Sequence, residues 1–188
     1  MIYPEKGTLN RFMFKTPLIW WRMGLGPLLS HQMMGGSKML LITAWGRKSG
    51  KPRHTMLTYV SVNEMEYVCS GWGARSDWYK NIMANPGVTV QVGNRTYIAE
   101  AYRVEAPDEF KEVANEMFET GGDSHFKPWL ESYGIKFNRE DMINNRKRLH
   151  IVGFKRGGQE GPPELTNDLV WVWGVIILIL GGVFWIIF

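Results

Sequence analysis

The chain has 188 residues, a length that predicts one sizeable hydrophobic core rather than two. Its formal net charge of +4 and its 45% of hydrophobic residues suit a globular protein with a mild attraction to anionic partners. A single cysteine excludes an internal disulfide framework and a thiolate zinc site, and the four histidines show no metal-ligand spacing, so we expect no metal.

Residues 1–35 are predicted to form an N-terminal amphipathic, helical segment. Between Asn10 and Leu29, basic side chains are interspersed with phenylalanine, isoleucine and tryptophan. Such a segment can lie in the headgroup plane of a membrane. It can equally pack its aromatic face on the folded domain, with Pro17 marking a kink or a new start. The sequence leaves both interpretations open.

Residues 36–156 are predicted to form the folded domain. Strands are indicated by apolar runs or by alternation of polar and apolar residues at 38–45, 54–62, 65–72, 87–92, 95–104 and 148–154. Helices are expected at 77–85, ending before Pro86, at 106–122 and at 126–145. Connections of hairpin length, such as Gly93-Asn94, favour antiparallel pairing. The fold class is therefore mainly β with helices (α+β), a barrel of about six antiparallel strands.

The C-terminal residues 169–188 form a run of 20 residues without a charge, which predicts a transmembrane tail anchor. A helix of that length spans roughly 30 Å, the thickness of the hydrocarbon core of a bilayer. Trp171, Trp173 and Trp185 would lie in the two interfacial belts. Because the nearby positive charges all precede the run, we expect a single-pass membrane protein whose folded domain faces the cytoplasm. Residues 157–168, rich in Gly and Pro, would be a flexible linker.

A cationic loop, GRKSGKPRHT at residues 46–55, requires an anionic partner or solvent. It is not a phosphate-binding P-loop, because only three residues separate Gly46 from Gly50 and Pro52 stands where Ser or Thr should bind magnesium. Nucleic acid is a poor fit, since the charge is one local cluster. By itself the loop could be a solvated hairpin.

A second cluster, SGWGARSDWYKN at residues 70–81, favours a flat ligand. Its glycines let the backbone approach such a ligand closely, and its indole rings can stack on it. Arg75 and Lys80 add charge for further anionic groups. Two clusters of this kind in one domain favour a ligand over a solvated hairpin.

Together, GRKSGKPRHT and SGWGARSDWYKNIMANPGVTVQVG resemble the deazaflavin-dependent nitroreductase family, whose members use coenzyme F420. The resemblance covers roughly residues 38–103 and implies a split β-barrel of the flavin-reductase type. It implies that the cofactor phosphate and its acidic oligoglutamate tail are held by Arg47, Lys48, Ser49 and Arg53. The deazaflavin ring would lie against Val68, Cys69, Ser70 and Gly71. The residues that would close over the ring are Asp77, Trp78, Tyr79, Lys80 and Asn81.

The predicted chemistry is hydride transfer from reduced F420 to an apolar acceptor, such as a quinone or a nitro or enone compound, by a membrane-tethered oxidoreductase. Candidates for orienting or donating the proton that completes the reduced product are Ser70, Tyr79 and Tyr133. Cys69 lies among apolar residues and is expected to be an inert buried thiol. Two alternatives remain, an FMN-dependent reductase of the same fold and a non-catalytic membrane protein that binds a cofactor or an anionic lipid.

Overall fold

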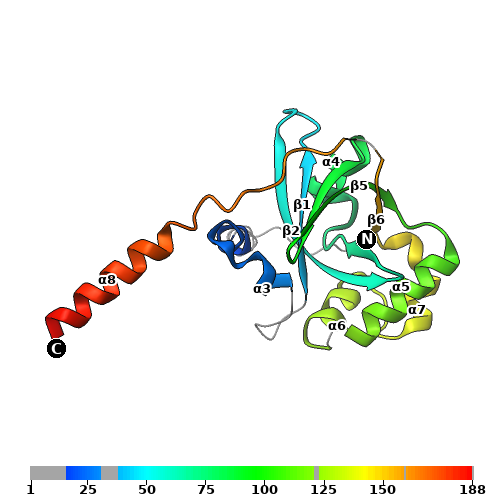
Figure 1. Ribbon diagram of the computed structural model, residues 1–188. Coiled ribbons are helices and arrows are strands. Elements are labelled where there is room, and N and C mark those ends of the chain that lie inside the picture. The colour runs from blue at the N-terminus through cyan, green and yellow to red at the C-terminus, as the bar shows by residue number, and fades with distance from the viewer. Residues whose placement is uncertain (1–15, 31–37, 121–122, 159, 188) are drawn as a thin grey trace.

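The computed structural model describes residues 16–30, 38–120, 123–158 and 160–187 (Figure 1). Its centre is a closed barrel in which every neighbouring pair of strands is antiparallel. The strands are β1 (Met39–Trp45), β2 (Pro52–Val62), β3 (Met65–Cys69), β4 (Gly87–Val92), β5 (Arg95–Arg103) and β6 (Ile151–Arg156). They follow one another around the barrel in the order β1-β2-β3-β6-β5-β4. The predicted barrel of six antiparallel strands is confirmed.

Strand β4 shows why the sheet closes into a barrel. Its six residues, GVTVQV, are all buried, because one face lines the barrel core and the other is covered from outside. The barrel closes where β1 pairs with β4, from Leu41 opposite Gln91 to Ala44 opposite Val88. Many of the interior side chains are small or β-branched, and these pack well on pleated strands, while Leu40 and Phe154 fill the larger spaces. Its fully buried members include Leu40, Ile42, Val88, Val90, Ala99, Val152 and Phe154.

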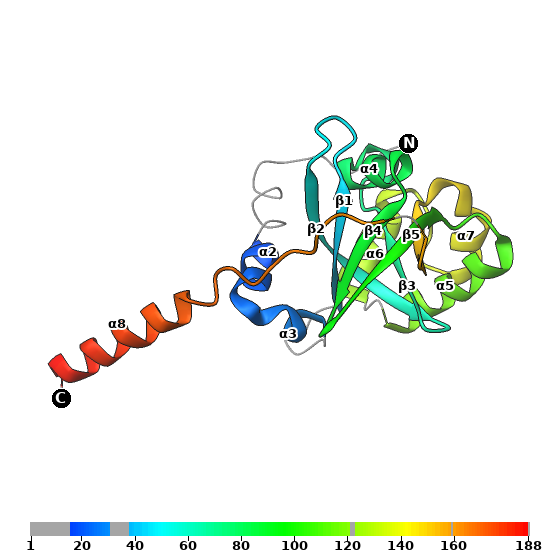
Figure 2. The same ribbon diagram turned by 45° about the horizontal axis from the view of Figure 1, so that its top comes forward.

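A second core lies between the barrel and a group of helices on one side of it (Figure 2). These helices are α5 (Pro107–Thr120), α6 (Asp123–Ser132) and α7 (Arg139–Asn144), followed by the short turn η3 (Arg146–Arg148). Phe110, Leu130 and Tyr133 are almost completely buried there against Tyr67 of β3 and Ile151 of β6. Helix α4 (Asp77–Ala84), preceded by the turn η2 (Gly73–Arg75), packs on β1 and β5 instead.

The N-terminal helices pack on the domain. They are α2 (Thr16–Trp20), the π-helical segment η1 (Trp21–Leu25) and α3 (Gly26–Ser30). Trp21 is only 3% exposed and forms a third apolar cluster with Leu41 of β1 and Met56 of β2. Ile19 and Trp20 remain exposed. Of the two interpretations open for this segment, packing on the domain holds for Trp21, while residues 1–15 and 31–35 lie outside the described residues.

Residues 157–168 lie on the barrel along part of their length, where their composition suggested a free coil. The backbone at Leu165 makes two hydrogen bonds to the side chain of Gln91, donating to Oε1 at 2.9 Å and accepting from Nε2 at 3.1 Å. Thr89 donates its hydroxyl to the carbonyl of Pro162. At Gly161 a Cβ would come within 2.7 Å of the Thr89 hydroxyl, so only glycine allows this close approach. We call residues 160–168 the strap.

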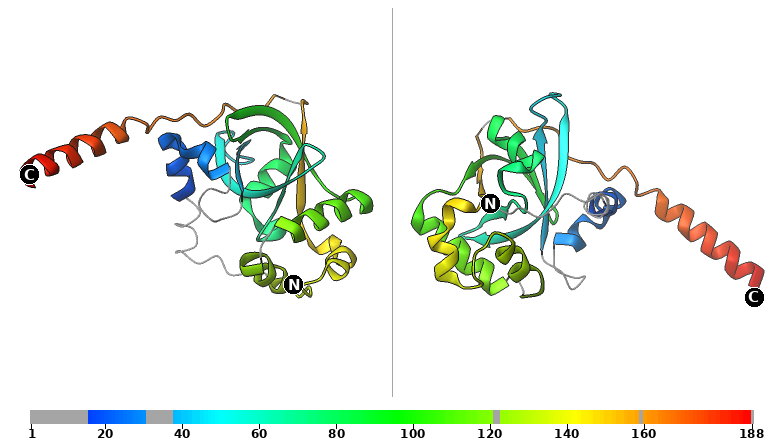
Figure 3. Two further views of the ribbon diagram at one scale, coloured as in Figure 1. Left: turned by 60° about the horizontal axis from the view of Figure 1, so that its bottom comes forward. Right: turned by 180° about the vertical axis from the view of Figure 1, so that it is seen from behind.

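The prediction of a membrane anchor at residues 169–188 is wrong, and with it the membrane partner and the single-pass localisation with a cytoplasmic domain. Helix α8 (Val172–Ile187) has 16 residues, which span about 24 Å, less than the hydrocarbon core of a bilayer. Within the described residues, no helix has both the length and the apolar character needed to cross a membrane. Figure 3 shows α8 projecting away from the barrel on the side opposite α5, α6 and α7.

The apolar run is shortened at its start because its first residues contact the N-terminal helices. The Leu169 N–H donates to the carbonyl of Arg22 at 3.0 Å, and the Trp173 indole N–H donates to the carbonyl of Met23 at 2.8 Å. Arg22 also forms a two-pronged ion pair with Asp168, at 2.7 and 2.6 Å. A hydropathy count treats residues 169–171 as part of a span, whereas in the structure they form a turn that precedes α8, with the Leu169 N–H bonded to Arg22.

Candidate functional site

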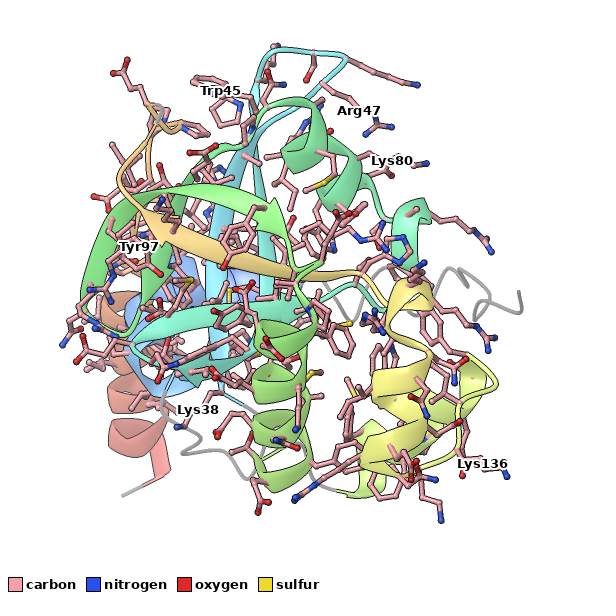
Figure 4. The ribbon with its side chains drawn as sticks, turned by 90° about the vertical axis from the view of Figure 1, so that its right-hand side faces the viewer. Lys38, Trp45, Arg47, Lys80, Tyr97 and Lys136 are labelled. Carbon is pink, nitrogen blue, oxygen red and sulfur yellow. The ribbon has the colours of Figure 1, made fainter. Side chains whose placement is uncertain are left out.

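The two predicted motifs lie at the same end of the barrel. Strands β1, β3 and β5 end there and β2, β4 and β6 begin there, as the antiparallel register requires. The cationic loop joins β1 to β2, and residues 70–81 follow β3. Figure 4 shows Arg47 and Lys80 near Trp45 at this end, with Lys38 at the other. We call it the motif end.

The cationic loop is a tight turn that points its charges outward. The N–H groups of Ser49 and Gly50 both donate to the carbonyl of Gly46, at 3.0 and 2.8 Å. A Cβ at Gly46 would lie 2.7 Å from the Ser49 hydroxyl and 3.2 Å from the carbonyl oxygen of Lys51, so a larger residue here would require the loop to shift. Lys48, Ser49 and Arg53 are exposed, and Arg53 donates to the Ser49 hydroxyl at 3.3 Å. These groups are arranged to meet an anion from solvent.

Arg47 joins the cationic loop to helix α4. Its guanidinium donates to the side-chain oxygen of Asn81 at 2.9 Å and to a carboxylate oxygen of Asp77 at 3.2 Å, and its backbone N–H donates to Asn81 at 3.2 Å. Asn81 is buried, whereas Asp77 and Lys80 are exposed. Arg47 therefore differs from Lys48: part of its hydrogen-bonding capacity already binds the two motifs to each other.

Two of the three predicted catalytic hydroxyls hold the segment that follows β3. Ser70 is fully buried, and its hydroxyl donates to the carbonyl of Gly73 at 2.8 Å and lies 2.6 Å from the hydroxyl of Ser76. The hydroxyl of Tyr133, from α6 and the turn after it, donates to the carbonyls of Ser70 and Gly71 at 2.9 and 3.1 Å. Both side chains thus fix the path of the chain from β3 into α4.

Tyr79, the third candidate, lies on the inner face of α4 and is buried in the barrel core. Burial raises the pKa of its phenol, an effect that the guanidinium of Arg103 partly opposes. Its ring meets the edge of Trp78 at 6.0 Å between centroids, and Trp78 is itself half-buried against the barrel core. Tyr79 therefore belongs to the barrel core, whereas Trp78 is partly exposed at the motif end.

The residues of β3 divide between the two cores. Val68 is buried in the barrel interior, whereas Cys69 packs toward the helices. Burial raises the pKa of the Cys69 thiol to about 12, which keeps it protonated and unreactive. Gly71 is partly exposed, and a Cβ there would meet nothing closer than the Trp129 indole nitrogen at 4.0 Å. Its backbone is open to a flat ligand.

Sequence reasoning missed His150, which lies directly beside the second motif. Its carbonyl accepts the Ser70 N–H at 3.0 Å, and its ring meets the edge of the Tyr79 ring at 5.1 Å with an interplanar angle of 86°. The signal was present in the predicted strand RLHIVGF, because alternation places His150 on the same face as Val152, which lines the barrel core. A polar residue at an inward-facing position of a predicted strand is the signal that could have identified His150.

The opposite end of the barrel offers a poorer place for an acidic ligand. A cavity of about 280 Å³ there is lined by Ser61, Glu64, Glu66, Arg95 and Arg156. Glu66 is almost fully buried and accepts the Tyr97 hydroxyl at 2.5 Å, with the two arginines at 3.5 and 3.9 Å. The two glutamates and the two arginines that line this cavity cancel in charge, so it carries no net positive charge to attract an acidic ligand, in contrast to the cationic loop.

A closed antiparallel barrel with exposed cations beside an open glycine backbone and buried aromatic rings defines a protein that can hold an anionic, ring-bearing cofactor. The chain belongs to the F420H(2)-dependent quinone reductase family, whose family model matches residues 20–122. The name of this family refers to reduced coenzyme F420 and to the reduction of quinones. The matched region includes the cationic loop and residues 70–81, and it ends before Tyr133 and His150.

The chain is also similar to individual curated relatives and solved structures. Two strains of Mycobacterium tuberculosis, H37Rv and CDC 1551, each have an F420H(2)-dependent quinone reductase that is 32% identical over 88 residues. That match covers 45% of this chain and 59% of each relative. A solved F420-H2 dependent reductase, FDR-A, is 24% identical with a TM-score of 0.42, covering 62% of this chain and 91% of that one. A haem storage protein from Vibrio cholerae is 13% identical with a TM-score of 0.43, covering 77% and 91%.

Proposed function

We propose that this chain transfers a hydride from reduced F420 to a small apolar acceptor of the quinone type. The family supports the cofactor, and its name supports the acceptor. The observation that carries the proposal is the junction at Arg47, which brings the cationic loop and the segment after β3 to one end of the barrel. A ligand with a phosphodiester, several carboxylates and a flat ring would contact the cationic loop with its anionic groups and the segment after β3 with its ring.

In this proposal Lys48, Ser49 and Arg53 hold the phosphate and the acidic tail, since their exposed donors suit charge-assisted hydrogen bonds. Arg47 contributes charge while it keeps α4 against the loop. The open backbone at Gly71 faces the ring, with Val68 behind it in the barrel and Trp78 beside it. When bound, the cofactor supplies the two-electron hydride chemistry. The protein orients the reactants and excludes water.

Ser70 and Tyr133 enter this proposal as positioning residues. Their hydroxyl groups donate to the carbonyls of Gly73, Ser70 and Gly71, so each acts on a ligand through the backbone that it holds. Tyr79 supports the same region from α4. No covalent nucleophile is required for hydride transfer, in keeping with the unreactive thiol of Cys69.

The test is a pair of binding titrations followed by a turnover assay. We expect the purified chain to bind F420 in preference to FMN, and to oxidise F420H2 when the water-soluble quinone menadione is added. Replacing Lys48 and Arg53 with alanine should weaken F420 binding most at low salt, because screening reduces charge interactions. Lys136→Ala, which removes an exposed charge far from the motif end, is the matched control.

Three results would contradict the proposal in different ways. Preference for FMN would make the chain a flavin-dependent reductase of the same fold. Binding of F420 without oxidation of F420H2 by menadione or by nitro or enone compounds would make it a carrier of the cofactor. Equal loss of binding in Lys136→Ala would show that the cationic loop has no special part in recognition.

A further inference from the structure

His150 is a buried imidazole that the fold alone does not explain. Its side chain is 8% exposed, and Nδ1 is sealed from solvent without a hydrogen-bond partner among the described residues. Buried polar atoms without a partner are uncommon in native proteins, and each one calls for a reason. A leucine or phenylalanine would fill the same space without leaving a polar atom unpaired.

The groups around His150 keep its imidazole neutral near pH 7. Burial lowers its pKa, the guanidinium of Arg103 on β5 lowers it further, and the backbone carbonyl of Arg148 opposes these effects. The Tyr79 ring on α4 and the Ser70 backbone directly after β3 complete its surroundings. A neutral imidazole has one N–H and one lone pair, and it can therefore accept a proton and pass it on.

His150 lies beside the segment that the proposed function sets against the cofactor ring. Ser70 and Gly71 form that backbone, the carbonyl of His150 accepts the Ser70 N–H, and the imidazole of His150 packs against the Tyr79 ring. The hydroxyls of Ser70 and Tyr133 already donate to backbone carbonyls. Burial raises the pKa of Tyr79, which makes its phenol a weaker acid. Among these four side chains, His150 is the one suited to take up a proton at neutral pH.

Resting on the proposed function, we propose that His150 carries the proton that accompanies hydride transfer. Reduced F420 loses a hydride and a proton, and a quinone gains both to become a hydroquinone. The hydride brings two electrons to the acceptor and leaves a negative charge on its oxygen. His150 takes up the proton and delivers it to that oxygen, where an O–H bond forms. The imidazole returns to its neutral form, and no further oxidant or reductant is needed.

The first test observes the imidazole directly and needs no turnover. In the free chain carrying labelled histidine, the His150 resonance is identified by its loss in His150→Gln. We expect this resonance to titrate below the ordinary histidine range and to be neutral at pH 7. Addition of oxidised F420 should shift it. The resonance of His125, which lies on α6 and outside both motifs, should shift much less.

The second test is the pH dependence of kcat/KM with F420H2 and menadione. In the unsubstituted chain the rate should fall by about tenfold per pH unit below the pKa of His150. His150→Gln should lower kcat by on the order of a hundredfold and remove this acidic limb. The Kd for F420 should stay within about threefold. His125→Gln, on α6 and outside both motifs, is the control and should keep both kcat and the acidic limb.

If His150 only fills space in the core, its variants should give different results from those expected above. His150→Phe keeps an aromatic ring against Tyr79 but has no ring nitrogen, so full activity in that variant would overturn the proposal. An acidic limb that persists in His150→Gln, or a His150 resonance unmoved by F420, would overturn it as well. If His150→Gln unfolds, His150→Phe supplies the same comparison. Failure of the unsubstituted chain to bind F420 would instead overturn the proposed function on which this one rests.

Discussion

The side chain of Asn81 accepts two hydrogen bonds from Arg47, one from the backbone N–H at 3.2 Å and one from the guanidinium at 2.9 Å. Asn81 is buried and Arg47 is mostly covered, so the pair forms part of the domain and not only of its surface. The cationic loop and helix α4 are therefore joined before any ligand binds. This preorganisation reduces the cost of ordering the loop on binding.

Arg47→Ala should destabilise the domain, whereas Lys48→Ala should not. The arginine variant loses the charge-assisted bond to buried Asn81, at a cost of about 1–2 kcal/mol. Both variants should weaken F420 binding, because both remove a positive charge. Thermal melts beside F420 titrations separate the two effects. An unchanged melting temperature in Arg47→Ala would contradict the structural role of this residue.

Tyr133→Phe should lower the melting temperature by about 2–6 °C, because the carbonyls of Ser70 and Gly71 lose their shared donor. Binding of F420 should weaken as the segment after β3 becomes less ordered. Tyr59→Phe removes a hydroxyl from a partly buried tyrosine of the barrel and serves as the control. Equal effects of the two variants on F420 binding would speak against a role for Tyr133 in positioning this segment.

Trp78→Ala should leave the domain folded and reduce F420 binding, since Trp78 is only half-buried. Tyr79→Ala should cost about 3–5 kcal/mol, because it empties a buried position in the barrel core. Circular dichroism melts of both variants, followed by F420 titration of any that stay folded, provide the measurement. Unfolding of Trp78→Ala would assign this ring to the core alone.

The free energy of unfolding should decrease as the pH falls below about 6.5. Burial lowers the pKa of His54 and of His150, with Arg22 and Arg103 adding to the respective shifts. In this pH range the unfolded chain therefore binds more protons than the folded chain, which favours unfolding at acidic pH. Urea melts from about pH 7 to about pH 5 measure the slope. His150→Phe should make it shallower, and an unchanged slope would mean that His150 is not held neutral.

Gln91→Ala should release the strap. The substitution removes both hydrogen bonds to the backbone of Leu165, and we expect faster proteolysis between residues 160 and 168. Thr96→Ala changes the exposed residue opposite Gln91 on β5 and is the matched control. Affinity for F420 should not change, because the strap lies along β4. Equal proteolysis in both variants would show that other contacts hold the strap.

The barrel and the motif end could be predicted because their signals are local. Alternation in β2, the Gly93-Asn94 turn and the two motifs each depend on residues close in sequence. The failures involve contacts between distant residues. The shortening of the apolar tail depends on Arg22, 146 positions from Asp168, and the order of the strap depends on Gln91. A hydropathy window contains none of these partners.

The candidate site shows the same division. The sequence indicated which residues gather at the motif end, because the residues of each motif are neighbours in the chain. It could not indicate the direction of the Ser70 hydroxyl, which depends on Gly73 and Ser76, or the donor role of Tyr133, 63 positions away. Nor could it show that His150 pairs with Ser70, because that contact follows from the register of β3 with β6.

The seam between β1 and β4 makes the site depend on a pairing between strands that are distant in the sequence. Its pairs, such as Leu41 with Gln91, close a long loop, and the entropy of loop closure must be overcome before they form. Arg47 follows one strand of the seam and Asn81 precedes the other, so the pairing of these two strands holds the two halves of the site together. A cofactor bound there stabilises the native state alone. F420 should therefore slow the hydrogen exchange of core amides in all six strands together, those remote from the motif end included.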